Sequence, residues 1–335
     1  MSRALEALLA EPGVTDVLVN APGDVWVDRG EGLVRVAADL GDEPAVRRLA
    51  QRLVGAAGRR LDDSCPYADA MLPDGTRLHA VLAPVAVRGT ALSLRVPRRT
   101  RFSLADLVAA RTLPADGAPW LRALVEARLA VLVSGGAGTG KTTLLATLLG
   151  LVAPDERIVL VEDTRELDPA HPHVVRLEAR PPNVEGAGAI AVRDLVRQAL
   201  RMRPDRLVVG EVRGGEVIDL LAALNTGHRG GGGTVHANEA AAVPARLEAL
   251  AMAAGMDRAA LHAQLAAGID AVVHLEREGD GRRVTGIAVP ERGPDGLVRL
   301  VRAVRFRNGV VLVGPAFSEL GSLLEARGIA VPEPR

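Results

Sequence analysis

The sequence predicts a two-domain α/β protein in which a smaller α/β domain precedes a larger domain with a mostly parallel sheet. The chain of 335 residues is 48% hydrophobic and 24% charged, which is typical of a globular protein long enough for two domains. A glycine-rich loop follows an apolar run at residues 131–133 and precedes leucines at helical spacing. Predicted strands and helices then alternate, as they do around a parallel sheet that binds its ligand at the carboxyl ends of its strands.

The predicted domains are residues 1–96 for the smaller one and 116–335 for the larger one, with a linker at residues 97–115. In the smaller domain, alternating apolar residues and Pro/Gly turns predict strands, and one apolar helical face predicts a helix. The strands are expected at residues 14–19, 25–28, 71–81 and 90–96, and the helix at 43–56.

In the larger domain, strands are expected after the glycine-rich loop at residues 158–161, 174–177, 207–209 and 234–237. Helices are expected between and after them, at residues 189–202, 216–225, 243–256 and 258–267. The segment from residue 270 onward is read as strands with Gly/Asp turns and a final short helix.

The glycine-rich loop reads Gly135-x-x-x-x-Gly140-Lys141-Thr142, the pattern of a P-loop that binds nucleoside triphosphates. Glycines let backbone N–H groups turn toward a polyphosphate, and the start of the following helix favours the same anion. Lys141 is expected to reach the β- and γ-phosphates, and the Thr142 hydroxyl to ligate Mg²⁺. The predicted ATP contacts are Gly135, Gly136, Ala137, Gly138, Thr139, Gly140, Lys141, Thr142 and Thr143.

The alternative for this loop is a glycine-rich turn with an incidental lysine. Composition argues against it, because Lys141 is the only lysine among 41 basic residues. At this position a compact point charge suits phosphate better than a planar guanidinium does.

Two further predicted strands end in carboxylates, Glu162 with Asp163 and, later, Glu211. Carboxylates in such positions beside a P-loop hold the Mg²⁺ shell or orient the attacking water. Glu162 is predicted to polarise the water, and Glu211 is predicted to join Thr142 at the metal. The alternative for each carboxylate is a solvated strand end.

His228 and His236 flank a run of four glycines. They suit a loop that senses the γ-phosphate, whereas metal binding is disfavoured because no cysteine or third histidine shares the segment. The glycine run is equally compatible with a slack loop.

Composition excludes other classes of protein. Zero formal net charge (41 basic, 41 acidic) and 2% aromatic residues disfavour direct nucleic-acid binding. The single cysteine, Cys65, excludes an intrachain disulfide framework and a cysteine-rich zinc site. The chain has no signal-peptide pattern and no apolar run long enough for a bilayer, so a cytoplasmic location is expected.

Residues 180–214 closely resemble the secretion ATPases of type II and type IV machines; they read R-P-P-N-V-E-G-A-G-A-I-A-V-R-D-L-V-R-Q-A-L-R-M-R-P-D-R-L-V-V-G-E-V-R-G. Within that superfamily they are most similar to the tight-adherence (Tad/Flp) pilus branch. The likeness spans roughly residues 14 to 275 and includes V-T-D-V-L-V-N-A-P-G, L-P-D-G-T-R-L-H-A, E-D-T-R-E-L, N-T-G-H and T-V-H-A-N.

This resemblance implies a homo-hexamer of subunits with an N-terminal domain and a RecA-like ATPase domain. ATP hydrolysis would drive pilin assembly or export through an inner-membrane platform protein, from the cytoplasmic face of the membrane. The pilin or secreted substrate would be contacted only indirectly.

The resemblance also implies roles for individual residues. Residues 135–142 are the Walker A loop, and Glu211 closes the Walker B strand. Glu162 and Asp163 belong to the Asp box, and the His box holds His228 and His236. The N-terminal-domain arginines that reach the nucleotide are Arg77 and Arg95.

Three departures from the family pattern bear on this reading. A helical extension that many relatives carry before the first domain is not expected, and residues 229–233 are unusually rich in glycine. The four-cysteine module of general type II secretion ATPases is absent, which favours the pilus or type IV branches.

The alternatives to a pilus-assembly ATPase are a type IV secretion or conjugation ATPase, a RecA-like nucleic-acid motor, and a nucleotide-gated scaffold without turnover.

Overall fold

The protein consists of two compact units, of which the first holds residues 3–96 and the second nearly all described residues from 101 onward. The structure is a computed structural model that describes residues 3–96, 101–180, 182, 187–279, 281–307 and 309–334. Residues 97–100, where the predicted linker begins, lie outside the described residues. The rest of that predicted segment contains a short helix, α3 (Leu104–Ala109), which belongs to the second unit.

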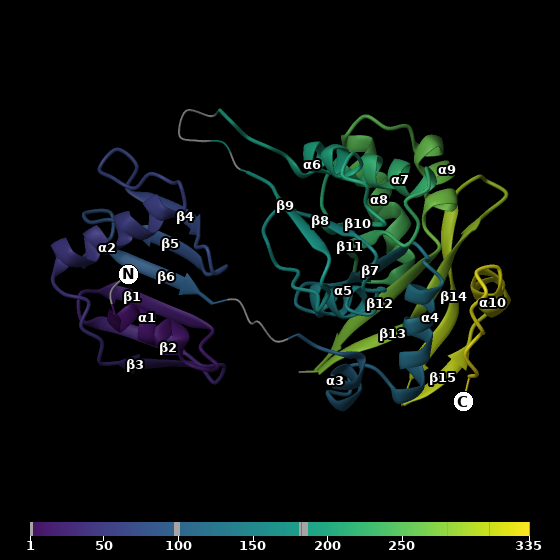
Figure 1. Cartoon of the computed structure of the whole chain (residues 1–335), viewed down its shortest axis with the longest axis horizontal. Helices are drawn as coiled ribbons and strands as arrows, with labels where there is room; N and C mark the ends of the chain where they lie inside the picture. Colours follow the sequence, from purple (N-terminus) through teal and green to yellow (C-terminus); the bar gives the residue numbers. More distant parts are fainter. Residues whose placement is uncertain are drawn as a thin grey trace. The chain divides into compact units, whose positions relative to one another are not determined.

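The first unit is a six-stranded antiparallel sheet with two helices (Figure 1). Its strand order is β3-β2-β1-β6-β5-β4. The strands are β1 (Asp16–Ala21), β2 (Asp24–Asp28), β3 (Leu33–Val36), β4 (Tyr67–Met71), β5 (Arg77–Val81) and β6 (Ala91–Arg95), and the helices are α1 (Arg3–Ala10) and α2 (Glu43–Ala56). The helix predicted at residues 43–56 is confirmed, whereas α1 and β3 were not predicted.

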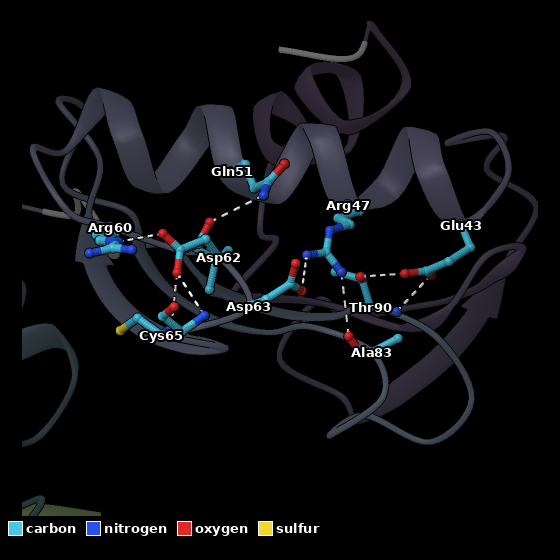
Figure 2. A network of polar contacts seen from close by, with 11 residues as sticks. Glu43, Arg47, Gln51, Arg60, Asp62, Asp63, Cys65, Ala83 and Thr90 are labelled. Carbon is cyan, nitrogen blue, oxygen red and sulfur yellow. Dashed lines mark hydrogen bonds and ion pairs between the residues drawn. The ribbon is translucent and has the colours of Figure 1, made fainter.

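Polar contacts tie α2 to the loops beside it (Figure 2). The Glu43 carboxylate accepts hydrogen bonds from the Thr90 backbone N–H at 2.7 Å and from the Thr90 hydroxyl at 2.6 Å. One turn further along the helix, Arg47 forms an ion pair with Asp63. The apolar face of α2 is buried in one core with the inward side chains of the sheet.

The second unit is built on a nine-stranded mixed sheet with the order β15-β14-β13-β12-β7-β11-β10-β8-β9. From β12 to β9 all neighbours are parallel, and β13, β14 and β15 continue the sheet in antiparallel fashion. The parallel strands are β7 (Val131–Gly135), β8 (Ile158–Glu162), β9 (Val174–Glu178), β10 (Arg206–Val212), β11 (Gly232–His236) and β12 (Ala271–Glu278). The antiparallel strands are β13 (Gly281–Arg292), β14 (Val298–Arg307) and β15 (Val310–Val313).

Helices cover both faces of this sheet (Figure 1). One core contains residues of α3, α4 (Ala118–Glu126), α5 (Lys141–Leu149) and α10 (Phe317–Glu325). The other contains residues of α6 (Val192–Ala199), α7 (Glu216–Asn225), α8 (Val243–Ala253) and α9 (Arg258–Gly268). Short 3₁₀ turns, η1 (Ala115–Gly117) and η2 (Ala240–Ala242), precede α4 and α8. Because both faces are covered, β7 and β8 are buried along their whole length, which explains their continuous apolar sequences.

The α/β class and the P-loop context are confirmed, and differences lie at the ends of elements. The helix predicted at residues 189–202 is shorter, Val192–Ala199, and the strand predicted at 234–237 begins earlier, at Gly232. Among the described residues, no helix combines the length and apolarity that a bilayer crossing needs.

Candidate nucleotide-binding site

The P-loop leaves the sheet at the end of β7, between β11 and β12. Gly138 and Gly140 have φ angles of 69° and 92°, in the left-handed region that favours glycine. A Cβ atom at Gly135 would lie 2.6 Å from the Leu275 carbonyl oxygen and 2.7 Å from the Thr139 hydroxyl. Gly138 and Gly140 are therefore favoured by their backbone conformation, and Gly135 by the lack of space for a side chain.

Lys141 begins α5, and its ammonium donates a hydrogen bond to the Gly136 carbonyl at 2.8 Å. The Thr139 hydroxyl donates to the same carbonyl at 3.0 Å. Burial lowers the pKa of Lys141, and the nearby carboxylate of Glu211 opposes this shift. The first N–H groups of α5 have no acceptor within the helix, so the loop offers an anion both backbone donors and a partly buried cation.

The strand beside the P-loop carries the second predicted histidine. His236, the last residue of β11, lies opposite Gly135 in the parallel register. The next residue, Ala237, donates its N–H to the Gly135 carbonyl at 3.3 Å. The structure therefore places His236 beside the first glycine of the P-loop, and its predicted role at the γ-phosphate stays a prediction.

His228 lies elsewhere, so within this chain the structure does not bring the two histidines together. It follows α7 and precedes β11, whose first residue, Gly232, pairs with Val131 at the start of β7. His228 therefore lies at the edge of the sheet opposite the P-loop, where its Nδ1 is 3.2 Å from the Ala223 carbonyl oxygen. The two histidines are separated by the length of β11.

The four glycines between these histidines are packed, and are not a slack loop. A Cβ atom at Gly230 would lie 2.8 Å from the Arg206 guanidinium. Cβ atoms at Gly231, Gly232 and Gly233 would overlap the carbonyl oxygens of Leu207, Val131 and Val209, respectively. The run thus allows β11 to pack closely between β7 and β10, and the glycine-rich departure from the family pattern leaves His236 in place beside the P-loop.

Glu162 ends β8 and is buried, with 4% of its surface exposed. One of its carboxylate oxygens accepts the backbone N–H groups of Glu166 at 3.0 Å and Leu167 at 2.9 Å. Burial raises the pKa of Glu162, and these two hydrogen bonds oppose the shift. A buried carboxyl with a raised pKa suits a general base, and the same carboxyl also holds the turn that follows β8.

Glu211 lies near the end of β10 and forms an ion pair with Arg213 at 2.6 Å. The loop after β10 is held by Glu216, which is buried and accepts the N–H groups of Arg213 and Gly214 at 2.6 and 2.7 Å. Glu211 and Glu166 are the carboxylates whose charges act on Lys141. Glu211 and Arg213 therefore lie within electrostatic range of the P-loop lysine, as does Glu166, which sequence reasoning missed.

Arg77 and Arg95 lie in the first unit, on β5 and β6. They are direct cross-strand partners in the antiparallel register, and both are exposed. The structure therefore places the two arginines side by side, and their predicted contact with nucleotide stays a prediction.

A buried pair beside the P-loop was also missed. Ser134, just before the first glycine of the motif, contacts His274 on β12, the neighbouring strand. Ser134 is an ordinary member of an apolar strand in the sequence, and His274 lies far from every motif. Only the pairing of β7 with β12 brings them together.

The residues present fit a magnesium–nucleotide complex. Among the described residues, no group of three or more His, Cys, Asp or Glu side chains forms a metal site. Mg²⁺ in nucleotide sites is commonly held by one or two protein ligands together with the phosphates, and Thr142 and Glu211 would serve as those ligands here. The metal would neutralise the charge that develops on the phosphates during transfer.

Comparison with known proteins gives the family. Residues 2–283 match the family model for type II/IV secretion system proteins. A putative conjugal transfer protein of Mycobacterium tuberculosis is 58% identical over 303 residues, covering 89% of this chain and 86% of that protein. The type IV secretion system protein PtlH of Bordetella pertussis is 34% identical over 317 residues, covering 85% and 93%.

Among solved structures, the pilus retraction motor PilT with bound ADP has the same fold. Its TM-score is 0.62 at 19% sequence identity, over 96% of this chain and 85% of that one. The family model covers residues 2–283, and that range includes the P-loop and the carboxylates near the ends of β8 and β10. This chain belongs to the type II/IV secretion system protein family.

Proposed function

We propose that this protein is an ATP-hydrolysing motor of a type IV secretion or conjugal transfer machine. The observation that carries the proposal is the P-loop, whose Lys141 begins α5 within range of the charges of Glu211 and Glu166, in the same unit as the buried Glu162. This arrangement supplies a phosphate cradle, a cation and candidates for the metal ligand and the general base. The names of relatives that are 58% and 34% identical refer to conjugal transfer and to type IV secretion.

In this proposal, Lys141 and the backbone of residues 135–142 bind the β- and γ-phosphates. Thr142 and Glu211 hold Mg²⁺, and Glu162 accepts the proton of the attacking water. His236, which ends β11 opposite Gly135, is proposed to register the presence of the γ-phosphate. Arg77 and Arg95 are proposed to reach the nucleotide from the first unit.

We further propose that the motor acts as a homo-hexamer at the cytoplasmic face of the membrane, on an inner-membrane platform protein. Assembly of a tight-adherence pilus is the second candidate function. It is supported by the sequence of residues 180–214 and by the absence of a four-cysteine module in a chain with one cysteine. Export and pilus assembly differ in cargo and use the same ATPase chemistry.

The experiment that tests hydrolysis is Lys141→Ala, assayed by phosphate release and by ATP binding. We expect turnover to be abolished and ATP binding to weaken, because no other lysine exists to reach the phosphates. Arg122→Ala is the matched control, since Arg122 is exposed on α4 and pairs only loosely with Glu126, at 3.9 Å. Turnover near the wild-type rate in Lys141→Ala would contradict the assignment of the P-loop.

A second experiment separates the two cargoes. Lys141→Ala is introduced into the host that encodes this chain, and plasmid transfer, secreted protein and surface pili are compared with the wild type. Loss of transfer or secretion with pili intact would support the type IV proposal. Loss of pili alone would support the tight-adherence candidate.

A further inference from the structure

The hairpin of β14 and β15 forms one edge of the nine-stranded sheet (Figure 1). Among the described residues, β15 pairs with β14 only, so no strand pairs with the backbone groups of its outer edge. On one face of the hairpin, Ala303, Val304, Phe306 and Val311 are buried in the core that also holds α4 and α10. The hairpin is therefore anchored through its buried face, and in the described part of the chain its outer edge has no strand partner.

The opposite face of the hairpin carries exposed apolar side chains. Val310 and Leu312, on this face, are 44% and 43% exposed. In the register, Leu312 lies beside Arg305 and Val310 lies beside Arg307. Apolar side chains on an open strand edge are a common site for pairing with another chain.

Three arginines of β14, Arg302, Arg305 and Arg307, lie exposed beside these apolar residues. In the part of the chain that the structure describes, none of the three forms an ion pair. Arg299, on the same strand, is paired with Asp295. We call Arg302, Arg305, Arg307, Val310 and Leu312 the basic edge patch.

We propose that the basic edge patch docks an extended acidic segment of a partner protein, which adds to β15 as a further strand. Strand addition satisfies the open backbone groups of β15, and apolar side chains of the segment cover Val310 and Leu312. Acidic side chains of the segment meet the unpaired arginines, whose long side chains reach diagonally across neighbouring strands. This docking does not require bound nucleotide, so it is independent of the proposed ATPase activity.

The test uses the full chain without nucleotide and a short labelled glutamate–valine peptide, with binding followed by fluorescence anisotropy. Serine takes every second position of this peptide and glutamate and valine alternate at the others, so both kinds of side chain lie on the face that meets Val310, Leu312 and the arginines. One control peptide has the same sequence with every backbone nitrogen methylated, so that neither of its edges can pair, and another has lysine in place of glutamate. We expect each control to bind at least about tenfold more weakly, because one loses edge hydrogen bonds and the other meets like charge.

Variants of the protein locate the site. Arg305→Glu and Leu312→Lys are each expected to weaken binding of the glutamate–valine peptide by about tenfold or more. Arg299→Glu is the matched control and should bind like the wild type, because that arginine is already paired with Asp295. All these side chains are exposed, and a circular dichroism melt verifies that each variant is folded.

Several outcomes would overturn the proposal. Absence of binding of the glutamate–valine peptide would contradict the docking of an acidic segment. Equal binding of its methylated form would exclude strand addition. Binding to phosphatidylserine vesicles without binding to the peptide would assign the patch to a membrane. Self-association of the wild type that Leu312→Lys abolishes, without peptide binding, would assign it to a second copy of the chain.

Discussion

His274 Nδ1 lies 2.8 Å from the Ser134 hydroxyl oxygen, and 0% of Ser134 and 4% of His274 is exposed. The two residues are register partners on the parallel strands β12 and β7. Ser134 immediately precedes Gly135, and the residue after His274 packs its carbonyl against that glycine. The pair therefore helps to fix the backbone from which the P-loop departs.

The first prediction concerns pH. Burial lowers the pKa of His274, with the carboxylate of Glu276 opposing the shift. The unfolded chain takes up a proton at this histidine below about pH 6.5, whereas the folded chain does so only at lower pH, so acidification through this range destabilises the fold. We expect urea unfolding to show a smaller loss of stability between pH 7 and about pH 5.5 in His274→Asn than in the wild type.

The comparison with His274→Asn is needed because other groups act in the opposite direction. Burial raises the pKa of Glu162 and of Asp270, and these carboxyls favour the folded state as pH falls. Their contribution is common to both proteins and cancels in the difference. An equal loss in wild type and variant would mean that His274 does not resist protonation.

The second prediction separates the chemistry of Glu162 from its role in holding a turn. Glu162→Gln keeps an oxygen for the N–H groups of Glu166 and Leu167 and removes the proton acceptor. We expect ATP affinity near the wild-type value and turnover lower by about 10²–10⁴-fold, the usual contribution of a general base. Equilibrium nucleotide binding and phosphate release measure the two quantities.

Glu162→Ala is the matched comparison. It leaves two backbone N–H groups without their acceptor, so we expect a loss of about 1–3 kcal/mol in unfolding free energy that Glu162→Gln does not share. Wild-type turnover in Glu162→Gln would leave Glu162 with the structural role alone. Glu166 and Glu211, whose charges act on Lys141, would then be the candidates for the base.

The third prediction tests the packing of the glycine run. Gly232→Ala would push a methyl group into the Val131 carbonyl oxygen, which is part of the backbone of β7. We expect a destabilisation of about 1–3 kcal/mol or more, as for an overpacked core, measured by chemical denaturation. Gly281→Ala is the control, because its Cβ would meet its nearest neighbour at an ordinary 3.4 Å. Equal stability of the two variants would contradict the close packing of β11.

The fourth prediction concerns Arg95, which is exposed beside Arg77 on the first unit. A charge-assisted contact with a γ-phosphate exists with ATP and is lost with ADP. We therefore expect Arg95→Ala to weaken binding of a non-hydrolysable ATP analogue, to lower turnover and to leave ADP affinity nearly unchanged. Solution scattering should show one average domain arrangement with either nucleotide in this variant.

The control for Arg95 is Arg29→Ala, which removes an arginine of the same unit that already pairs with Glu11. It should change neither affinity. If Arg95→Ala weakened ADP and the ATP analogue equally, Arg95 would not sense the γ-phosphate, and another residue would have to couple nucleotide state to the first unit.

Local sequence was sufficient where the determining interactions lie within a few residues. The P-loop was predicted because its glycines, lysine and threonine lie within eight consecutive residues, 135–142, that form a single loop and the start of a helix. The helix at residues 43–56 was predicted because its apolar face repeats at helical spacing, and in the structure Asp42 caps its first turn. The carboxylates near the ends of β8 and β10 were predicted because each apolar run in the sequence leads to an acidic residue.

The tertiary structure decided what depends on strand order. Ser134 and His274 are 140 residues apart in the chain, and only the insertion of β7 between β11 and β12 makes them neighbours. The same order sends His228 to the far edge and His236 to the P-loop. It also turns a glycine run that reads as slack into a packed strand, because backbone atoms of two neighbours occupy the space of its side chains. Such contacts join residues distant in sequence, so no local pattern encodes them.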